Sequence, residues 1–320
     1  MKILITGITG FVGSHLADYI LNNYPDNKIF GIKRWRSPRN NIKHIEEYLE
    51  LYNGDLRDLS SLLTILEKVK PDIIFHLAAQ PLVTTSYVAP VDTICTNVIG
   101  TINLLEAIRI LKIDPIIHVC SSSEVYGQVT EEDIPINETC PLRPVSPYAV
   151  SKVGEDMAAY MYYKAYNLKT IRTRMFTHTG PRRGEVFVVS FFAKQIAKIE
   201  RGMQKPTIRV GNLDSIRTFI DVRDAVKAYW LLVNKCRPGD VYNIGGSVSK
   251  SIREMLDLLL TYTDYKGRIG VEMDPELVRP TDVTLQIPDF SKFHKETGWT
   301  PEIQFEQTLQ DTLNYWRENI

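Results

Sequence analysis

Short apolar runs alternate with longer segments of helical period through the first half of the chain. A strand buried on both faces is apolar at successive positions, whereas an amphipathic helix repeats its apolar residues every three or four positions. This alternation predicts a parallel sheet covered by helices, which is a doubly wound α/β fold. The predicted strands are KILIT (2–6), KIFGI (28–32), DIIFHLA (72–78), PIIHVC (115–120) and KTIRTRMF (169–176).

The regular alternation ends after residue 176, where loops rich in Pro, Gly and Arg begin. Further helical periods occur at 189–201, 222–234 and 251–262. Because no Ser/Gly/Pro-rich linker intervenes, the later part is expected to be a smaller C-terminal α/β region built onto the sheet. We therefore expect a nucleotide-binding domain at 1–176, which a strand and helix around 207–242 rejoin. The substrate is expected to bind predominantly to 177–320.

A glycine-rich turn follows the first predicted strand directly. The segment TGITGFVGSHLADYIL places Gly7, Gly10 and Gly13 in the spacing G-x-x-G-x-x-G. The first glycine permits a tight turn, the second lets the backbone approach a pyrophosphate, and the third lets the helix pack on the strand. The first amides of the helix then face the anion. The segment predicts the dinucleotide site of a Rossmann fold, and Phe11 and Val12 are expected to line it.

The end of the second predicted strand indicates which dinucleotide binds. A site for NAD usually places an acidic residue here, but FGIK is followed by RWRS, so Lys33, Arg34 and Arg36 stand where a 2′-phosphate would lie. The basic residues favour NADP as the cofactor. The alternative is a basic loop that is merely solvated.

Two further segments are expected beside the cofactor. Asp55, in NGDLRD, follows the next strand and is placed to accept a hydrogen bond from the adenine amine, with Leu56 beside it. The run HLAAQ (76–80) supplies small residues where the backbone passes the cofactor. The expected contacts in that run are Leu77, Ala78 and Ala79.

Composition changes this picture little. The 320 residues include 38 Lys and Arg and 38 Asp and Glu, so whole-chain charge favours neither nucleic acid nor an anionic membrane as a partner. The N-terminus lacks a signal-peptide pattern and no apolar stretch approaches about 20 residues, which favours a cytoplasmic protein without membrane association. The four cysteines and six histidines are scattered, so we expect reduced, mostly buried thiols and no metal site.

A tyrosine and a lysine stand four residues apart in SPYAVSK, at the start of a predicted helix. Residues at this spacing share one helical face, so the Lys152 ammonium can lie near the Tyr148 phenol and lower its pKa. The phenol could then exchange a proton with a substrate hydroxyl. Upstream, HVCSSSEVYG (118–127) runs from an apolar strand straight into three serines and a glutamate.

These motifs together resemble the extended branch of the short-chain dehydrogenase/reductase superfamily across essentially the whole chain. The resemblance implies that Ser122 hydrogen-bonds the reacting hydroxyl or ketone. The sugar nucleotide 4,6-dehydratases of this superfamily add an acidic or Ser-Glu pair directly afterwards, and here that pair is Ser123 and Glu124. The SSE sequence is similar to the TSE of the GDP-mannose 4,6-dehydratases.

The dehydratase chemistry explains the extra pair. Transfer of a hydride from C4 to NADP gives a 4-ketone, which acidifies the C5 hydrogen. A carboxylate then removes that hydrogen, water leaves from C6, and the hydride returns to C6. Glu124 is the expected base at C5. Ser123 is expected to help protonate the departing C6 hydroxyl, directly or through a water.

The second half also resembles GDP-mannose 4,6-dehydratases, notably in PRRGE (181–185). The resemblance implies that Arg217 and Arg279 bind the nucleotide diphosphate and ribose. It places Lys194 on a helix aimed at the diphosphate, although Lys198 competes for that role. Residues implied on the cofactor side are His178 and Arg183, the latter serving either the cofactor phosphate or a neighbouring subunit. Residues implied on the substrate side also include Val188 and Thr177, the latter standing where the family usually has Asn.

The predicted function is an NADP-dependent GDP-sugar 4,6-dehydratase, a hydro-lyase that makes a GDP-4-keto-6-deoxy sugar. GDP-mannose, GDP-N-acetylglucosamine and a GDP-heptose remain open as substrates. The C-terminal third looks more like the GDP-4-keto-6-deoxy-mannose reductases, so an NADPH-dependent reductase is the main alternative. The further alternatives are a GDP-sugar epimerase or dehydrogenase and a non-catalytic nucleotide-binding sensor. The resemblance also implies a homodimer or homotetramer that pairs through helices near 95–111 and 149–166.

Overall fold

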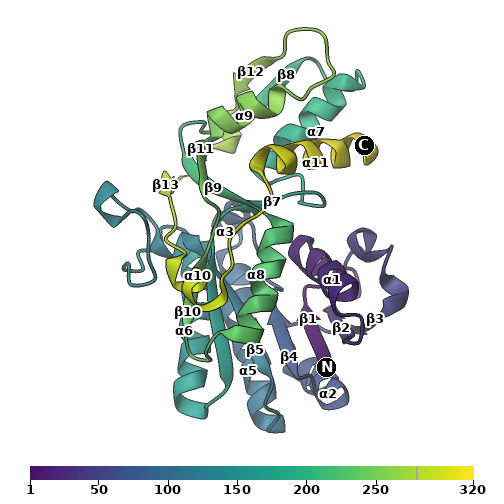
Figure 1. Cartoon of the computed structure of the whole chain (residues 1–320), viewed down its shortest axis with the longest axis vertical. Coiled ribbons are helices and arrows are strands. Elements are labelled where there is room, and N and C mark those ends of the chain that lie inside the picture. The colour runs from purple at the N-terminus through teal and green to yellow at the C-terminus, as the bar shows by residue number, and fades with distance from the viewer. Residues whose placement is uncertain (279) are drawn as a thin grey trace.

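The computed structural model describes residues 1–278 and 280–320 and confirms the predicted α/β fold (Figure 1). Within those residues, seven parallel strands form the central sheet in the order β10-β6-β5-β4-β1-β2-β3. From β1 the chain adds β2 and β3 on one side, and it then adds β4, β5, β6 and β10 on the other. The direction of strand addition therefore reverses between β1 and β4, which lie side by side. The strands are β1 (Lys2–Thr6), β2 (Lys28–Lys33), β3 (Leu49–Asn53), β4 (Ile73–His76), β5 (Ile116–Ser122), β6 (Lys169–Met175) and β10 (Val241–Ile244).

Helices bury both faces of this sheet. Successive side chains of a strand point to opposite faces, and in β1 the residues Ile3 and Ile5 join one apolar cluster whereas Leu4 joins the other. This arrangement explains why successive residues of β1 are apolar. The first face is covered by α1 (Phe11–Asn23), α8 (Val222–Lys235) and α10 (Ser291–Thr297), and the second by α2 (Leu59–Val69), α5 (Gly100–Leu111) and α6 (Pro147–Tyr166).

A smaller region lies above the carboxyl ends of the central strands, at the top of Figure 1. Its main sheet is centred on β9, which pairs with β7, β11 and β13, while β8 pairs with β12. The strands are β7 (His178–Thr179), β8 (Thr207–Val210), β9 (Ile216–Asp221), β11 (Val248–Ser251), β12 (Gly270–Met273) and β13 (Leu285–Gln286). A third apolar cluster packs β8, β9 and β11 against α7 (Val188–Glu200), α9 (Ile252–Leu260) and α11 (Phe305–Glu318).

Short helices connect these layers. Two of them, α3 (Val83–Val88) and α4 (Pro90–Ile94), precede a π-helical turn at Cys95–Ile99 that continues into α5. The 3₁₀ helices lie at Asn40–Ile42, Glu46–Tyr48, Ser123–Tyr126, Glu131–Asp133 and Pro275–Leu277. The predicted helices at 189–201, 222–234 and 251–262 correspond to α7, α8 and α9 with small shifts at their ends.

Two expectations from the sequence need correction. Over the described ranges, one continuous helical segment, Pro90–Leu111, is long and apolar enough to span a membrane by length and composition alone, and 39% of its apolar window is buried. Such a single segment is weak evidence, because core helices pass the same criterion. The four cysteines are free as expected, but of these only Cys236 is buried, since Cys95, Cys120 and Cys140 lie in partly exposed positions.

Candidate active site

The glycine-rich turn lies at the carboxyl end of β1, against the segment that follows β4. Gly7 has φ of +72°, and a Cβ atom there would lie 2.9 Å from the Ala78 Cα. A Cβ atom on Gly13 would lie 2.4 Å from the Gly7 carbonyl oxygen. The turn therefore requires glycine at both positions and brings Ala78 beside the first turn of α1, where Phe11 and Val12 also lie. This arrangement fits a pyrophosphate held by backbone amides.

The basic residues after β2 border a pocket of about 470 Å³, which is lined by Arg34, Arg36 and Asp55 among others. Lys33 is turned to the adjacent strand, where its Nζ donates to the Asn53 side-chain oxygen at 2.7 Å. The Arg36 guanidinium lies over the Trp35 ring, 4.9 Å from its centroid. Three arginines, Arg34, Arg36 and Arg57, therefore border this pocket, which suits a phosphate on an adenine ribose.

Asp55 also lines this pocket, and its carboxyl group favours the ionised form. Partial burial raises the pKa of Asp55, but the backbone N–H and guanidinium of Arg57 outweigh burial and lower the pKa below its usual value. The Arg57 N–H donates to the Asp55 carboxylate at 2.9 Å. Leu56, the next residue, is buried against Gly100. A second pocket of about 580 Å³ adjoins the first and is lined by Asp55, Cys95 and Ile99.

The start of α6 sets the positions of Tyr148 and Lys152. The Ser146 hydroxyl accepts a hydrogen bond from the Ala149 N–H at 3.0 Å, and Pro147 is the first helical residue, so both local signals start the helix here. Tyr148 and Lys152 are buried one turn apart, with the Lys152 Nζ 5.9 Å from the Tyr148 ring centroid. The structure therefore brings the two residues together as the spacing predicts.

The end of β5 supplies the neighbours of Tyr148. Burial raises the pKa of Tyr148 above its usual value and outweighs the positive charge of Lys152 and a hydrogen bond with Ser122, which both act to lower it. The Ser122 hydroxyl also accepts the Glu124 N–H at 3.2 Å, which turns the chain into the 3₁₀ helix Ser123–Tyr126. Glu124 is half-buried on this turn. Ser122, Ser123 and Glu124 thus follow β5 directly, and Ser122 meets Tyr148.

Ser123 has a partner that the sequence did not indicate. Its hydroxyl donates to the Gln286 side-chain oxygen at 3.2 Å, and both residues are buried. The Gln286 Nε2 atom is buried without a hydrogen-bond partner in the described part of the chain, which leaves a donor beside the Ser-Ser-Glu turn. The two residues are 163 positions apart and β13 has only two residues, so no spacing or periodicity signals this contact.

An aromatic residue of β7 and a basic residue of the loop after it pack against the first turn of α1. The His178 ring stacks on Phe11 with centroids 5.8 Å apart, and burial lowers the pKa of His178 to about 3, so its ring is neutral. The Arg183 guanidinium lies 4.8 Å from the Phe11 ring centroid and 3.7 Å from that of Phe187. Burial lowers the pKa of Arg183 to about 10. Both side chains therefore lie beside the helix that begins at the glycine turn.

Arg182, the preceding residue, was not predicted to have a role. Its guanidinium donates to the Asp18 carboxylate at 2.6 Å and to the Asn41 carbonyl oxygen at 3.0 Å. These contacts tie PRRGE to α1 and to the loop after β2. The sequence shows two adjacent arginines, but only the fold shows that Arg182 binds α1 and the loop after β2, whereas Arg183 lies over the Phe11 ring.

The residues expected on the substrate side lie in the smaller region. Lys194 on α7 forms an ion pair with Glu185, and its Nζ lies 4.9 Å from the Trp316 ring centroid. Arg217 on β9 is buried and donates to the Asp282 carboxylate at 3.2 Å.

Three further residues were expected on the substrate side. Val188 begins α7, and the Thr177 carbonyl oxygen accepts the Ile220 N–H at 3.0 Å, which joins the segment before β7 to β9. Arg279, the remaining expected contact, lies outside the described residues.

A glycine turn after β1, a serine at the end of β5 and a buried Tyr-Lys pair on α6 define a short-chain dehydrogenase/reductase of the extended kind. Comparison with known proteins identifies the family. The family described as GDP-mannose 4,6 dehydratase matches residues 4–312, and the chain belongs to it. This membership confirms the resemblance predicted from the sequence.

Individual relatives extend over nearly the whole chain. A GDP-mannose 4,6-dehydratase from Vibrio cholerae is 34% identical over 98% of this chain and 92% of its own length. A GDP-6-deoxy-D-mannose reductase from Pseudomonas aeruginosa is 30% identical over 100% of this chain and 98% of its own. A solved structure of RMD from Pseudomonas aeruginosa complexed with NADPH has a TM-score of 0.87 and 29% identity, covering 100% and 99% of the two chains.

Proposed function

We propose that the protein is an NADP-dependent GDP-sugar 4,6-dehydratase. The observation that carries the proposal is the Ser-Ser-Glu turn at the end of β5, where Ser122 meets Tyr148 and Glu124 follows two residues later. Membership of the GDP-mannose 4,6 dehydratase family supports it. A simple C4 oxidation or reduction needs Ser122, Tyr148 and Lys152, whereas removal of a C5 hydrogen needs a further base, and Glu124 provides one.

The proposed steps use residues of this chain. Tyr148 takes the proton of the C4 hydroxyl while Ser122 hydrogen-bonds the same oxygen, and Lys152 favours the ionised phenol. Glu124 then removes the C5 hydrogen, and Ser123, held by Gln286, assists departure of the C6 hydroxyl. The bound NADP would accept the C4 hydride and return it to C6. The two protons taken up by Tyr148 and Glu124 are given back, one to the departing C6 hydroxyl, which leaves as water, and one to C5 when the hydride is added to C6. One water is therefore lost per GDP-sugar, with no net change in the cofactor.

NADP is the proposed cofactor. The fit of the glycine turn to a pyrophosphate and the basic pocket of Arg34 and Arg36 support it, as does the NADPH bound in the structure of RMD. We propose that 1–176 together with α8 and β10 forms the NADP-binding part and that 177–320 predominantly binds the GDP-sugar. Arg217, Lys194 and Arg279 are the proposed diphosphate and ribose contacts, and GDP-mannose is the first proposed substrate.

Replacing both Arg34 and Arg36 by alanine is expected to weaken NADP binding at least about tenfold while changing NAD binding little. The reason is that the two guanidinium groups are proposed to contact the 2′-phosphate, which NAD lacks, and charge-assisted hydrogen bonds to such a group contribute about 1.5–3 kcal/mol. Isothermal titration calorimetry with each dinucleotide measures the ratio. Arg39→Ala, on the same loop but paired with Glu46, is the control. Equal weakening of NAD and NADP would contradict the assignment.

A reductase acting on a GDP-4-keto-6-deoxy sugar is the second candidate, favoured by the match to the Pseudomonas aeruginosa reductase over the full chain. One experiment separates the two. The purified protein is incubated with GDP-mannose without reduced cofactor, then with GDP-N-acetylglucosamine and a GDP-heptose, and each sugar nucleotide is followed by mass spectrometry. Loss of one water supports the dehydratase. An unchanged mass, with gain of two hydrogens by a 4-keto-6-deoxy sugar given NADPH, establishes the reductase.

The proposed partner is a second copy of the chain. Helix α6 packs against α4, the π-helical turn Cys95–Ile99 and α5. Large apolar side chains of α4, of this turn and of α6 are exposed. Such an apolar surface favours burial in an interface. The exposed residues are Val91, Ile99, Val150, Met157, Tyr160 and Met161.

Replacing Met157 and Met161 together by glutamate is expected to give a monomer at micromolar concentration, because two charges would be buried without partners in the proposed interface. Light scattering coupled to gel filtration measures the mass. The control is Met203→Glu, an exposed methionine in the loop after α7. A multimer of unchanged mass in the double variant would place the interface elsewhere.

A further inference from the structure

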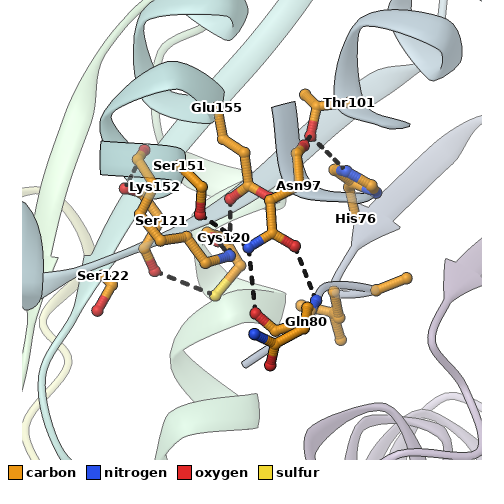
Figure 2. Close-up of polar contacts among 12 residues, drawn as sticks. His76, Gln80, Asn97, Thr101, Cys120, Ser121, Ser122, Ser151, Lys152 and Glu155 are labelled. Atoms are coloured by element: carbon orange, nitrogen blue, oxygen red, sulfur yellow. Dashed lines mark hydrogen bonds and ion pairs between the residues drawn. The ribbon is translucent and has the colours of Figure 1, made fainter. Parts of the chain in front are cut away.

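A buried carboxylate contacts the proposed catalytic lysine, and neither the sequence patterns nor the proposed steps assign it a role. Glu155 lies one turn after Lys152 on α6 and is 1% exposed. The Lys152 Nζ donates to the Glu155 carboxylate at 2.7 Å and to the Cys120 carbonyl oxygen at 3.0 Å. Figure 2 shows Lys152 and Glu155 meeting between α6 and the end of β5.

The fold gives this ion pair little stabilising value. Removing two charges from water costs several kcal/mol, and apolar residues of similar size often stabilise a protein as well as a buried ion pair does. Both partners here are nearly free of solvent contact, so the pair is neither screened nor hydrated. A carboxylate at this position therefore calls for an explanation in the chemistry of Lys152.

The contacts of Lys152 provide that explanation. An ammonium group has three N–H donors. In the described structure, the hydrogen bonds from Lys152 to Glu155 and to the Cys120 carbonyl oxygen use two of these donors. The third N–H is then available for the phenol of Tyr148 or for a ribose hydroxyl. The carboxylate thus fixes the direction of the ammonium.

The carboxylate also offsets part of the positive charge that acts on Tyr148. Burial lowers the pKa of Lys152, but the negative charge of Glu155 raises it above its usual value. Among the influences on the pKa of Tyr148, burial raises it, Lys152 lowers it, and Glu155 raises it. Glu155 therefore keeps Lys152 charged and at the same time weakens its pull on the phenol.

We propose that Glu155 is a positioning residue that holds the Lys152 ammonium through a buried ion pair and sets the acidity of Tyr148. The inference rests on the proposed role of Tyr148 and Lys152 in proton transfer. It goes further by assigning the control of that proton transfer to a third residue of the same helix.

Other titratable groups surround the pair. Burial lowers the pKa of His76 and of His118 to about 3 each, so both rings are neutral and add no charge. Asp156, the next residue of α6, pairs with Arg172 and Arg174 on β6. The groups that face the pair are Tyr148 and Asp156 on α6, Cys120 and His118 on β5, and His76 on β4.

The pH dependence follows from the ionisation of Glu155. Burial raises the pKa of Glu155 to about 7, against the lowering effect of Lys152. Above that pH the carboxylate is charged and opposes loss of the Tyr148 proton, and below it the carboxylate is neutral and the opposition disappears. In Glu155→Gln, as long as Lys152 remains protonated, Tyr148 should therefore ionise at lower pH than in the natural chain, whereas the two proteins should converge in activity below about pH 7.

The test is a substrate-free titration of Tyr148 by tyrosinate absorbance, taken as the difference between each protein and its Tyr148→Phe counterpart. In Glu155→Gln the midpoint is expected to move to lower pH, so that tyrosinate at a fixed alkaline pH below the midpoint rises at least about threefold. Glu155→Asp, which keeps the charge, should restore most of the original midpoint. An unchanged midpoint in Glu155→Gln overturns the proposal.

A matched control separates this effect from general damage. Glu138 is a half-buried carboxylate with a pKa raised by burial, and it accepts the Asn243 N–H at 2.8 Å on β10 instead of contacting Lys152. Glu138→Gln should leave the Tyr148 midpoint in place. A midpoint that shifts equally in both variants contradicts the proposal.

A second measurement keeps the proposal testable if Glu155→Gln does not fold. In the natural sequence labelled with ¹³C at the glutamate carboxyl carbons, one resonance should titrate near neutral pH and shift in Lys152→Met. Absence of any glutamate resonance that responds to Lys152→Met overturns the ion pair. Because neither titration uses a sugar nucleotide, a failure to dehydrate GDP-mannose would refute the proposed function and leave this test intact.

Discussion

Tyr148→Phe is expected to abolish hydride transfer from C4 of the GDP-sugar, with a loss in turnover of about 10²–10⁴-fold or more. The substitution removes the oxygen that takes the C4 proton, while the buried ring remains in place at the start of α6. Rapid-mixing absorbance of the reduced nicotinamide after addition of GDP-mannose measures the step directly. No reduced cofactor should accumulate, and no dehydrated product should form.

A tyrosine of the same helix provides the control. Tyr162 is also buried, and its hydroxyl donates to Glu106 at 2.6 Å, away from Lys152. Tyr162→Phe should therefore retain hydride transfer even if the free energy of unfolding falls by about 1 kcal/mol through the lost hydrogen bond. Turnover of Tyr148→Phe equal to that of the natural chain would remove Tyr148 from the mechanism.

Glu124→Gln is expected to stop loss of water while C4 oxidation still occurs. An amide keeps the shape of the side chain but cannot accept the C5 hydrogen as a proton, so product formation should fall by about 10²–10⁴-fold. Because Tyr148, Lys152 and Ser122 are unchanged, reduced cofactor should accumulate together with the 4-keto sugar. Single-turnover absorbance and mass spectrometry of the same sample measure the two steps separately.

The control for this variant lies a few residues later. Glu131 is an exposed residue that begins the 3₁₀ helix Glu131–Asp133, so Glu131→Gln should leave both steps unchanged. A normal rate of dehydration in Glu124→Gln would require another base at C5. Loss of both C4 oxidation and dehydration would instead give Glu124 a role in binding the substrate.

Features that depend on neighbouring residues could be predicted from the sequence. Five of the seven central strands could be predicted because burial on both faces favours successive apolar residues, and β1 lies at the predicted residues 2–6. The runs of β3 and β10 were not among the predicted strands. Tyr148 and Lys152 were paired correctly because four residues make one turn of α6. The glycine spacing was equally informative, since the positive φ of Gly7 and the close approach at Gly13 are local backbone requirements.

Contacts between distant segments could not be predicted in this way. Gln286 reaches Ser123 only because β13 joins β9 in the smaller region. Arg182 and Arg183 are adjacent in the sequence, yet one binds Asp18 and the other lies over Phe11. The fold of the whole chain decides which way each of these side chains points.

The role proposed for Glu155 depends both on its spacing in the sequence and on the packing of the fold. Its position three residues after Lys152 is fixed by the sequence, and residues at that spacing share a helical face. On an exposed helix such a pair contributes only about 0.2–0.5 kcal/mol, so the spacing alone suggests nothing unusual. Packing of α6 on β5 buries both charges beside Tyr148. The buried pair then affects the pKa of Tyr148 and so the proposed proton transfer.

The sequence by itself determined the class of fold, the glycine turn for a dinucleotide, and the Ser-Ser-Glu and Tyr-Lys motifs of the candidate site, because each depends on residues within one strand, turn or helical turn. The tertiary structure alone decided that Ser122 meets Tyr148, that Gln286 holds Ser123, and that the Lys152–Glu155 pair is buried. The physical reason is that burial and partners arise only when separate elements pack together, and burial governs the energy of a charge.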